Sequence, residues 1–382
     1  MIYLDNNSTT RVDPEVLKEM LPYFDSSYGN SSSTHTYGMI SHDAVKKARH
    51  QVANLLNCDS NEIFFTSGAT ESINFAIKGI ISYSTNRSPH IITVKTEHPA
   101  VLDSFRLMER GGAKVTYLPV NPEGLIDLAE MESHISKDTI LICVMLVNNE
   151  TGVIQPIKKI SEIAHRNDLI FMCDATQAVG KIPVDVNDYG IDILCFSGHK
   201  FYAPKGVGGI YLRSRRPFKP KIEPLFHGGG HERGMRSGTL NVPGIVGLGK
   251  AAEIAGDEMR SSSMRIKKLR DTLQKELLKI EQSTVTGNLE NRIYSTLNMC
   301  FPGADADAII SSLKNIAISN GSACTANSID PSHVLIAMGL SEAECFSSIR
   351  FSLGKFNTDE EIGIVINLFT ETVKRLRNFQ KA

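Results

Sequence analysis

The sequence has little of what nucleic-acid-binding or membrane-spanning proteins need. Lysine plus arginine number 41 against 42 aspartate plus glutamate, a formal net charge of −1, with no polybasic cluster or acidic tail. The basic footprint of a nucleic-acid-binding protein is therefore missing. No segment approaches the roughly 18 to 20 apolar residues that a membrane span requires. We expect no nucleic-acid partner and no membrane insertion.

Cysteine is sparse and follows no pattern. Seven occur in 382 residues, an odd number, and no CxxC pair is found. This excludes a disulfide framework and makes a structural zinc site a poor hypothesis. The first residues, MIYLDNNSTT, have neither the charged region nor the apolar stretch of a signal peptide. We expect a reducing, cytoplasmic location.

What the sequence does contain is an alternation of short apolar runs with longer amphipathic segments. Amphipathic patterns at 70–80, 98–110 and 157–167 lie between several of the runs, which predicts an α/β domain with a largely parallel sheet. The runs are nearly continuously apolar, as expected of strands that helices cover on both faces. The seven predicted strands are IFFT (63–66), HIITV (90–94), KVTYL (114–118), TILICVMLV (139–147), LIFMCDA (169–175), DILCFS (192–197) and GGIYL (208–212).

The rest of the chain predicts a smaller α+β domain. A long helical pattern covers 243–280, and beyond it lie a strand-like run, LNMCF (297–301), and a closing helix (358–377). We predict a large domain over 14–257 and a small domain formed by 1–13 together with 258–382.

One cysteine differs from the other six in its surroundings. Cys324 lies within SNGSACTANS (319–328), whose small polar residues predict a mobile loop on the small domain, where a thiol is exposed and able to react. The others fall in apolar runs, where cysteine is usually a small hydrophobe, or near helix ends without a motif. These are Cys143, Cys173, Cys195 and Cys300, and Cys58 and Cys345.

An acid and a lysine follow two consecutive predicted strands. LIFMC ends at Asp174, and DILCF ends in SGHK, which closes with Lys200. Ligands gather at the carboxyl ends of strands in open sheets of this kind. The two side chains could form a simple ion pair. The alternative is a pyridoxal-phosphate site, which needs a lysine for a Schiff base and an acid that keeps the pyridine nitrogen protonated.

A candidate phosphate anchor lies earlier in the chain. FFTSGATESINFAIKG predicts a strand, a glycine turn and a helix that starts near Gly68, Ala69 and Thr70. Backbone N–H groups and the helix dipole make such a turn a phosphate cradle, and Ser197 and His199 could add hydrogen bonds. The other interpretation is an ordinary helix capped by its own serine or threonine.

Further polar groups follow other strands. ILICVMLV ends at Asn148-Asn149-Glu150, and HIITVKTE ends at His98, before Pro99. An imidazole there could stack on a planar cofactor and move protons, or cap the helix that Pro99 opens. HGGGHERGMRSGT (227–239) fits phosphate or dimer contacts better than a metal pair, because glycines separate its histidines.

These residues together carry a resemblance to a known family. The motifs resemble a cysteine desulfurase of the NifS/IscS type, in the class V aminotransferase-like group of fold-type I pyridoxal-phosphate enzymes. They follow family order from LDNNSTT to the C-terminal region, which covers nearly the whole chain. The motifs are FTSGATES, TEHPAVLD, VNNETG, DATQAVGKIPVD, SGHKFYAPKGVGG, HGGGHERGMRSGTLN, GSACT and SSIRFSLGKFNT.

The resemblance implies a fold-type I transferase and a pyridoxal 5′-phosphate cofactor. Lys200 would carry the cofactor as a Schiff base. Asp174 would pair with the pyridinium nitrogen, and Gln177 would hydrogen-bond the ring oxygen. His98 would stack on the ring and serve in acid/base steps.

The resemblance also implies how the phosphate and the substrate are held. Asn149 and Arg350 would hold the cofactor and the carboxylate of L-cysteine, for which a guanidinium fork is suited. The phosphate ligands would be Ala69, Thr70, Ser197 and His199, with Thr239 reaching over from the second subunit of a homodimer.

The activity implied is removal of sulfur from L-cysteine. The Cys324 thiolate would attack the substrate sulfur, giving L-alanine and a Cys324 persulfide, a reversible state of a thiol. The sulfur would pass to an iron–sulfur scaffold or another sulfur-acceptor protein for assembly of a cluster or another thio-cofactor. Cys324 is also a candidate transient iron–sulfur ligand, and no other metal ligand is expected.

Two alternatives stay open from the sequence. One is a selenocysteine lyase or another class V enzyme, although a plain aminotransferase needs no thiol such as Cys324. The other is a non-catalytic cluster-assembly partner that uses Cys324 as a ligand or relay. Lys200, Asp174 and the phosphate turn disfavour it, because a binding module does not need a lysine that carries a cofactor.

Overall fold

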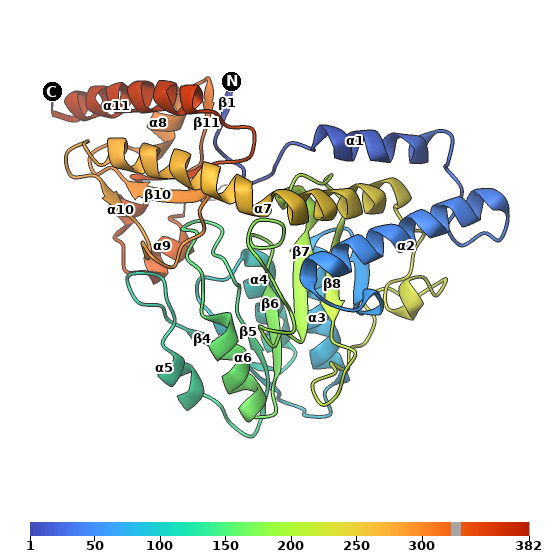
Figure 1. Cartoon of the computed structure of the whole chain (residues 1–382). Helices are drawn as coiled ribbons and strands as arrows, with labels where there is room; N and C mark the ends of the chain where they lie inside the picture. The colour runs from blue at the N-terminus through green and yellow to red at the C-terminus, as the bar shows by residue number, and fades with distance from the viewer. Residues whose placement is uncertain (322–329, 382) are drawn as a thin grey trace.

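The computed structural model describes residues 1–321 and 330–381 (Figure 1). Cys324 and most of the predicted loop 319–328 lie outside the described residues. Within the described part of the chain, none of the helices is both long and apolar enough to span a membrane.

A seven-stranded sheet forms the centre of the molecule. One strand, β8, runs antiparallel to both of its neighbours, and the remaining pairs are parallel. All seven predicted strands and the mostly parallel sheet are therefore confirmed. The strand order is β2 (Ile63–Thr66), β8 (Gly208–Leu212), β7 (Ile193–Ser197), β6 (Ile170–Asp174), β5 (Thr139–Cys143), β3 (His90–Val94) and β4 (Lys114–Leu118).

Helices cover both faces of this sheet because successive side chains of a strand point to opposite faces. Phe64 and Ile193 belong to the hydrophobic cluster on one face, whereas their neighbours Phe65 and Leu194 belong to the cluster on the other. The first face packs against α3 (Ala69–Tyr83) and α4 (Pro99–Arg110). The second packs against α2 (Thr36–Leu56), α6 (Ile157–Arg166) and the first half of α7 (Val242–Leu277). The strand cysteines Cys143, Cys173 and Cys195 are fully buried in these clusters, as expected of small hydrophobes.

A separate hydrophobic cluster lies at the end of the molecule that holds both termini (Figure 1). The second half of α7 contributes Ile266, Leu269 and Leu273 to it, and Leu4 joins from the N-terminal segment. This separation of cores supports the predicted domain division at 257/258, which remains a proposal. The elements of this part are β1 (Ile2–Tyr3), β9 (Thr284–Val285), β10 (Thr296–Cys300), α8 (Ala306–Ser312), β11 (Ile316–Ala317), β12 (Ser348–Ser352) and α11 (Asp359–Lys381).

The remaining elements are short. β1 pairs with β11, and β12, β10 and β9 form a three-stranded sheet. The other helices and 3-10 turns are α1 (Pro14–Met20), η1 (Leu21–Phe24), η2 (Ser60–Glu62), α5 (Leu128–Ser133), η3 (Gly198–Lys200), η4 (Glu232–Gly234), α9 (His333–Ala337) and α10 (Glu342–Cys345).

A buried ion pair secures the edge strand β2, which leads directly into the predicted phosphate turn. Glu232 accepts hydrogen bonds from Arg49 on both carboxylate oxygens, at 2.6 and 2.7 Å, and from the backbone N–H of Phe65 at 2.8 Å. Arg49 also donates to the Ile63 carbonyl at 2.8 Å. These side chains satisfy outward-facing backbone groups that an edge strand otherwise leaves unpaired.

Substituting Glu232 tests this anchor. Glu232→Ala leaves the nearly buried Arg49 guanidinium without its carboxylate partner, with only the Ile63 carbonyl to accept from it, and leaves the Phe65 N–H without a partner. We expect the free energy of unfolding, measured by urea denaturation, to fall by roughly 3 to 5 kcal/mol. The control is Glu19→Ala, which breaks the exposed pair with Lys47 and should change stability by less than about 1 kcal/mol. Equal losses in the two variants would contradict this account.

Candidate active site

A cavity of about 600 Å³ opens at the carboxyl ends of the parallel strands. Its size suits a small-molecule ligand. Of the predicted site residues, Thr239 is exposed and does not line the cavity, and Cys324 lies outside the described residues. The predicted residues that do line it are Ala69, Thr70, His98, Asn149, Asp174, Gln177, Ser197, His199, Lys200 and Arg350.

Lys200 lies in η3, immediately after β7, and its ammonium is held by main-chain carbonyls. Nζ donates to the carbonyl of Asn7 at 2.6 Å and to that of Ser8 at 2.7 Å. Both acceptors belong to the N-terminal segment, which crosses the strand ends and lines the cavity with Asn7, Ser8 and Thr9. The segment therefore fixes the position of the amine.

Asp174 is the last residue of β6, and β6 pairs in parallel with β7. The acid and the lysine thus lie at and just after the ends of two strands that are neighbours in the sheet. Oδ1 of Asp174 accepts from the Thr176 backbone N–H at 2.9 Å and from its hydroxyl at 2.5 Å. Oδ2 accepts no hydrogen bond from the described residues, so one carboxylate oxygen is available to a ligand in the cavity.

His98 both caps a helix and lines the cavity, so the two interpretations of it are compatible. Its Nδ1 accepts from the Ala100 N–H at 3.1 Å at the start of α4. Because Nδ1 accepts, the proton of the neutral ring is on Nε2. Burial lowers the pKa of His98; Asp174 opposes this shift, and Lys200 and His333 add to it.

The turn before α3 has the features of an anion site. Gly68 occupies the cap position with φ +153° and supplies no side-chain cap, so the first N–H groups of the helix are open to a ligand. The Ser197 hydroxyl lies close by, 3.3 Å from where a Cβ on Gly68 would stand. His199 Nδ1 lies 3.1 Å from the Thr9 hydroxyl. Burial and then the Lys200, Lys205 and Lys181 cations lower the pKa of His199 to about 4.

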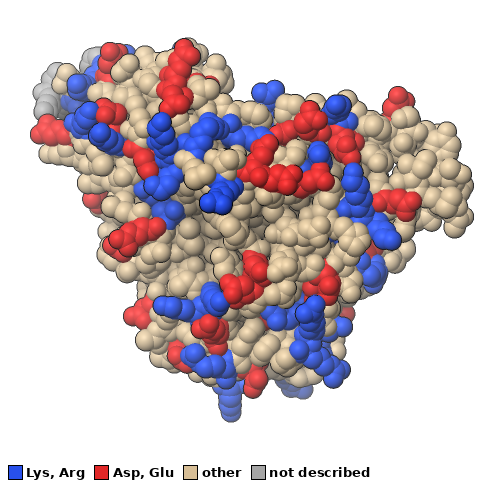
Figure 2. Space-filling model, viewed as in Figure 1, with Lys and Arg blue, Asp and Glu red and all other residues tan. Residues whose placement is uncertain are grey.

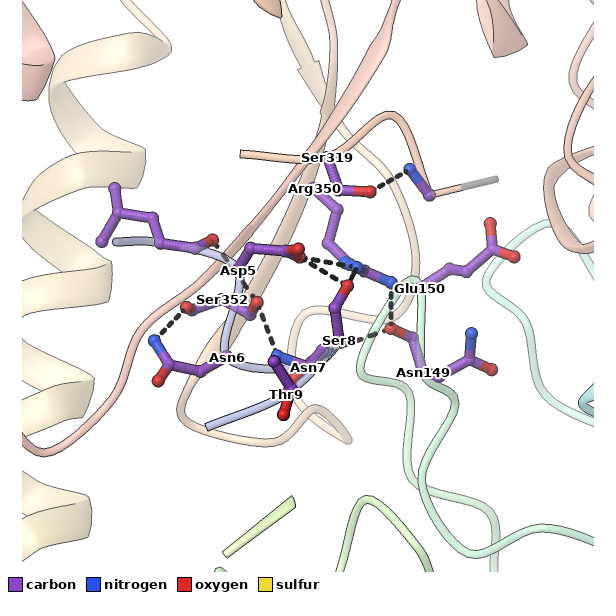
Figure 3. Close-up of polar contacts among 12 residues, drawn as sticks. Asp5, Asn6, Asn7, Ser8, Thr9, Asn149, Glu150, Ser319, Arg350 and Ser352 are labelled. Carbon is purple, nitrogen blue, oxygen red and sulfur yellow. Dashed lines mark hydrogen bonds and ion pairs between the residues drawn. The ribbon is translucent and has the colours of Figure 1, made fainter. Parts of the chain in front are cut away.

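Arg350, on β12, lines the cavity, and Figure 3 shows its polar contacts. Its side chain is 2% exposed and pairs with Asp5 at 2.8 Å. It also donates to the Ser8 hydroxyl at 2.8 Å and to the Asn149 carbonyl at 3.1 Å. Two buried polar atoms here have no partner among the described residues, namely Nε of Arg350 and Oδ1 of Asn149.

Sequence reasoning missed several residues of the cavity wall. Asn7 and Ser8 act on Lys200 through main-chain carbonyls, which leave no side-chain signal in a sequence. The motif LDNNSTT was part of the resemblance but suggested no role. A signal did exist for Thr176, since a hydroxyl two residues after a strand-end aspartate commonly bonds back to it. The other lining residues without a predicted role include Thr9, Lys205 and Gly206.

The residues present fit pyridoxal phosphate. An open helix N-terminus beside Ser197 suits a phosphate, and the free oxygen of Asp174 suits a protonated ring nitrogen. Lys200 supplies the amine at the same cavity. Among the described residues, no group of three or more His, Cys, Asp or Glu side chains is arranged to hold a metal ion.

Comparison with known proteins agrees with this geometry. The model of the family described as aminotransferase class-V matches residues 2–365. Cysteine desulfurase IscS of Anaeromyxobacter sp. (strain K) is 48% identical over 378 residues, covering 98% of this chain and 93% of that protein. Its namesake from Glaesserella parasuis serovar 5 is 50% identical over 381 residues, with the same coverages.

Solved structures give the same result. A NifS-like protein superposes with a TM-score of 0.91 at 39% identity, covering 98% of this chain and 99% of the other. A structure described as SspA in complex with cysteine superposes with a TM-score of 0.83 at 37% identity, covering 94% of this chain and 100% of the other. The predicted fold-type I architecture is thereby confirmed.

The lowered pKa of His199 predicts a pH dependence of stability. In the cofactor-free protein the folded state holds His199 neutral down to about pH 4, whereas the unfolded chain protonates near pH 6.5. The unfolded state therefore binds more protons between these values, and stability falls as the pH falls from 6.5 to 4. We would measure the free energy of unfolding by urea denaturation at pH 6.5 and at pH 4.5. The decrease between the two pH values should be smaller for His199→Gln than for the unsubstituted protein. Equal losses would show that His199 is not held neutral.

Proposed function

Because this chain belongs to the class-V aminotransferase family and, within it, to the cysteine desulfurases, we propose that it converts L-cysteine to L-alanine and a persulfide on Cys324. The observation that carries this proposal is the cavity where Lys200, Asp174 and the open N-terminus of α3 meet. The selenocysteine lyase alternative is not favoured, since the curated relatives reported above are named cysteine desulfurases.

The enzyme uses pyridoxal phosphate, as its family does, and the cavity residues suggest how the cofactor is held. Lys200 would bind it covalently, and Asp174 would hold its ring nitrogen protonated. Ala69, Thr70 and the Ser197 hydroxyl would hold its phosphate. When bound, the cofactor supplies an electron sink for bond breaking at the substrate α-carbon.

Two residues of the chain are suited to proton transfer. The Lys200 amine, once released from the cofactor, can take the α-proton of the substrate on Nζ. His98 is neutral at pH 7 and carries its proton on Nε2, because Nδ1 is occupied by the Ala100 N–H. That leaves Nε2 to give or take a proton at the cavity.

Arg350 is suited to hold the substrate carboxylate. It is buried and fixed by Asp5, Ser8 and the Asn149 carbonyl, and its Nε–H has no partner among the described residues. A fixed guanidinium loses little entropy when it binds a carboxylate. The unpaired Oδ1 of Asn149 is a second polar group that a bound ligand would satisfy.

The thiol of Cys324 can accept the substrate sulfur without a further oxidant or reductant. Its thiolate bonds to the substrate sulfur while the carbon–sulfur bond breaks. The electron pair of that bond stays on the carbon side, which is then protonated to alanine. Ser319 forms a backbone bridge with Arg350, so the segment that carries Cys324 leaves the described structure beside this arginine (Figure 3).

A homodimer is the proposed assembly. The arm formed by α1, η1 and α2 extends from the rest of the molecule (Figure 1), and its outer end is largely uncharged in the view of Figure 2. An exposed apolar patch of this kind marks an interface, and a second copy would also explain why Thr239 is exposed and outside its own cavity. The exposed apolar side chains of the arm are Leu17, Leu21, Phe24, Tyr28, Tyr37, Met39 and Ile40.

The destination of the sulfur is also a proposal. We propose a cytoplasmic enzyme that passes persulfide sulfur to an iron–sulfur scaffold or another acceptor protein. The similarity to cysteine desulfurases named IscS and the position of Cys324 in a predicted loop support this assignment.

Replacement of Cys324 separates cofactor binding from sulfur transfer. Cys324→Ser should keep the visible absorbance of the bound cofactor but lose sulfide release from L-cysteine by on the order of 100-fold or more, because a hydroxyl is a far weaker nucleophile than a thiolate. Lys200→Ala should lose both. The matched control is Cys58→Ser, at a half-buried cysteine outside the cavity, which should release sulfide normally. Normal sulfide release by Cys324→Ser would contradict the assignment of Cys324 as the nucleophile.

A further inference from the structure

A buried lysine lies behind the cavity wall without lining the cavity. Lys181 is 6% exposed, and Nζ donates to Oε1 of Gln177 at 2.7 Å. No other hydrogen bond of this ammonium is found among the described residues. An ammonium buried with one neutral partner is unfavourable for folding, so its presence calls for an explanation beyond packing.

The local backbone brings the two side chains together. After β6 the chain makes helical turns, with the Val179 N–H bonded to the Ala175 carbonyl at 2.9 Å and the Lys181 N–H to the Ala178 carbonyl at 3.0 Å. Side chains four residues apart lie on the same face of such a turn. Lys181 therefore reaches Gln177, which lines the cavity, although Lys181 itself does not.

The partners of the Gln177 amide determine its orientation. An ammonium only donates, so the atom facing Lys181 must be Oε1. A main-chain carbonyl only accepts, so the atom facing Asn7, at 2.9 Å, must be Nε2. With Oε1 and one N–H occupied, the amide has one N–H left, and Gln177 lines the cavity. That N–H can offer a ligand a hydrogen-bond donor.

We propose that Lys181 is a positioning residue, which holds the Gln177 amide so that its remaining N–H points at the ring oxygen of the bound cofactor. The inference rests on the proposed function, because it needs the cofactor ring to lie at Gln177. Without Lys181 the amide keeps only its contact with the Asn7 carbonyl, so its remaining N–H is held less firmly toward the ring oxygen.

The charge of Lys181 strengthens the effect. A cation behind the amide carbonyl polarises the amide and makes its N–H a better donor to an anionic ring oxygen. Burial, followed by the cations of Lys200 and Arg350, lowers the pKa of Lys181 to about 7. Asp174, an acid at the end of β6, precedes the turn that carries Gln177 and Lys181. An anionic ligand in the cavity would favour the protonated form of Lys181.

The test compares Lys181→Met with the unsubstituted holoenzyme. Met fills a similar volume without a donor, and replacing a buried cation by an apolar residue is generally tolerated by the fold. We expect the dissociation constant of pyridoxal phosphate to rise roughly two- to tenfold, the equivalent of one hydrogen bond. We also expect the pH midpoint of the visible cofactor band to move upward, because losing a donor and a cation favours protonation of the chromophore.

A double variant shows whether Lys181 acts through Gln177. Gln177→Ala alone should produce both changes, and adding Lys181→Met to it should produce little more. A second single variant, Lys181→Gln, keeps an N–H donor for Oε1 and should retain an affinity near that of the unsubstituted enzyme. The matched control is Lys158→Met, at an exposed lysine paired with Asp188, which should change neither quantity.

The outcomes distinguish this inference from the proposed function. If Gln177→Ala shifts the band but Lys181→Met does not, the positioning role is wrong and the proposed function stands. If Lys181→Met acts as strongly in the Gln177→Ala background, the lysine acts by charge alone and the inference is also wrong. If the unsubstituted enzyme binds no pyridoxal phosphate, the proposed function and the inference both fail.

Discussion

The main-chain carbonyl of Asn7 is the contact on which the geometry of the site depends. It accepts hydrogen bonds from Nζ of Lys200 at 2.6 Å and from Nε2 of Gln177 at 2.9 Å. Asn7 is itself fixed, because its N–H donates to the Ser352 hydroxyl and its Nδ2 to the Thr296 hydroxyl, each at 2.9 Å. Those two residues lie on β12 and β10. The N-terminal segment thus joins the small sheet to the strand ends of the large one.

This arrangement also concentrates positive charge where anionic ligands are expected. Lys200, Lys205 and Arg350 line the cavity, and Lys181 lies behind its wall. Burial lowers the pKa of His199 and of Lys181, and neighbouring cations of this group lower both further. A phosphate at the α3 turn and a substrate carboxylate at Arg350 would compensate these charges. These cations repel one another in the cofactor-free protein, and the same charges therefore favour the binding of anionic ligands.

Much of the fold could be predicted from the sequence because the strands are buried on both faces and form continuous apolar runs. The rule that ligands gather at strand ends then located His98, Asp174 and Lys200 in one cavity. The contacts of Lys200 with Asn7 could not be predicted, because they join a side chain to a main-chain carbonyl 193 residues away. Lys181 was missed because only tertiary packing shows it to be buried. Cys324 and Thr239 remain predictions, the first outside the described residues and the second dependent on a partner subunit.

The central claim is that Lys200, and not a neighbouring lysine, carries the cofactor. The cavity region offers three lysines for comparison, Lys181, Lys200 and Lys205. Borohydride reduction of the holoenzyme, followed by proteolysis and mass spectrometry, fixes the cofactor to the lysine that binds it. The account predicts the added mass on the peptide that contains Lys200. Finding it on Lys181 or Lys205, or on no lysine, would contradict the account.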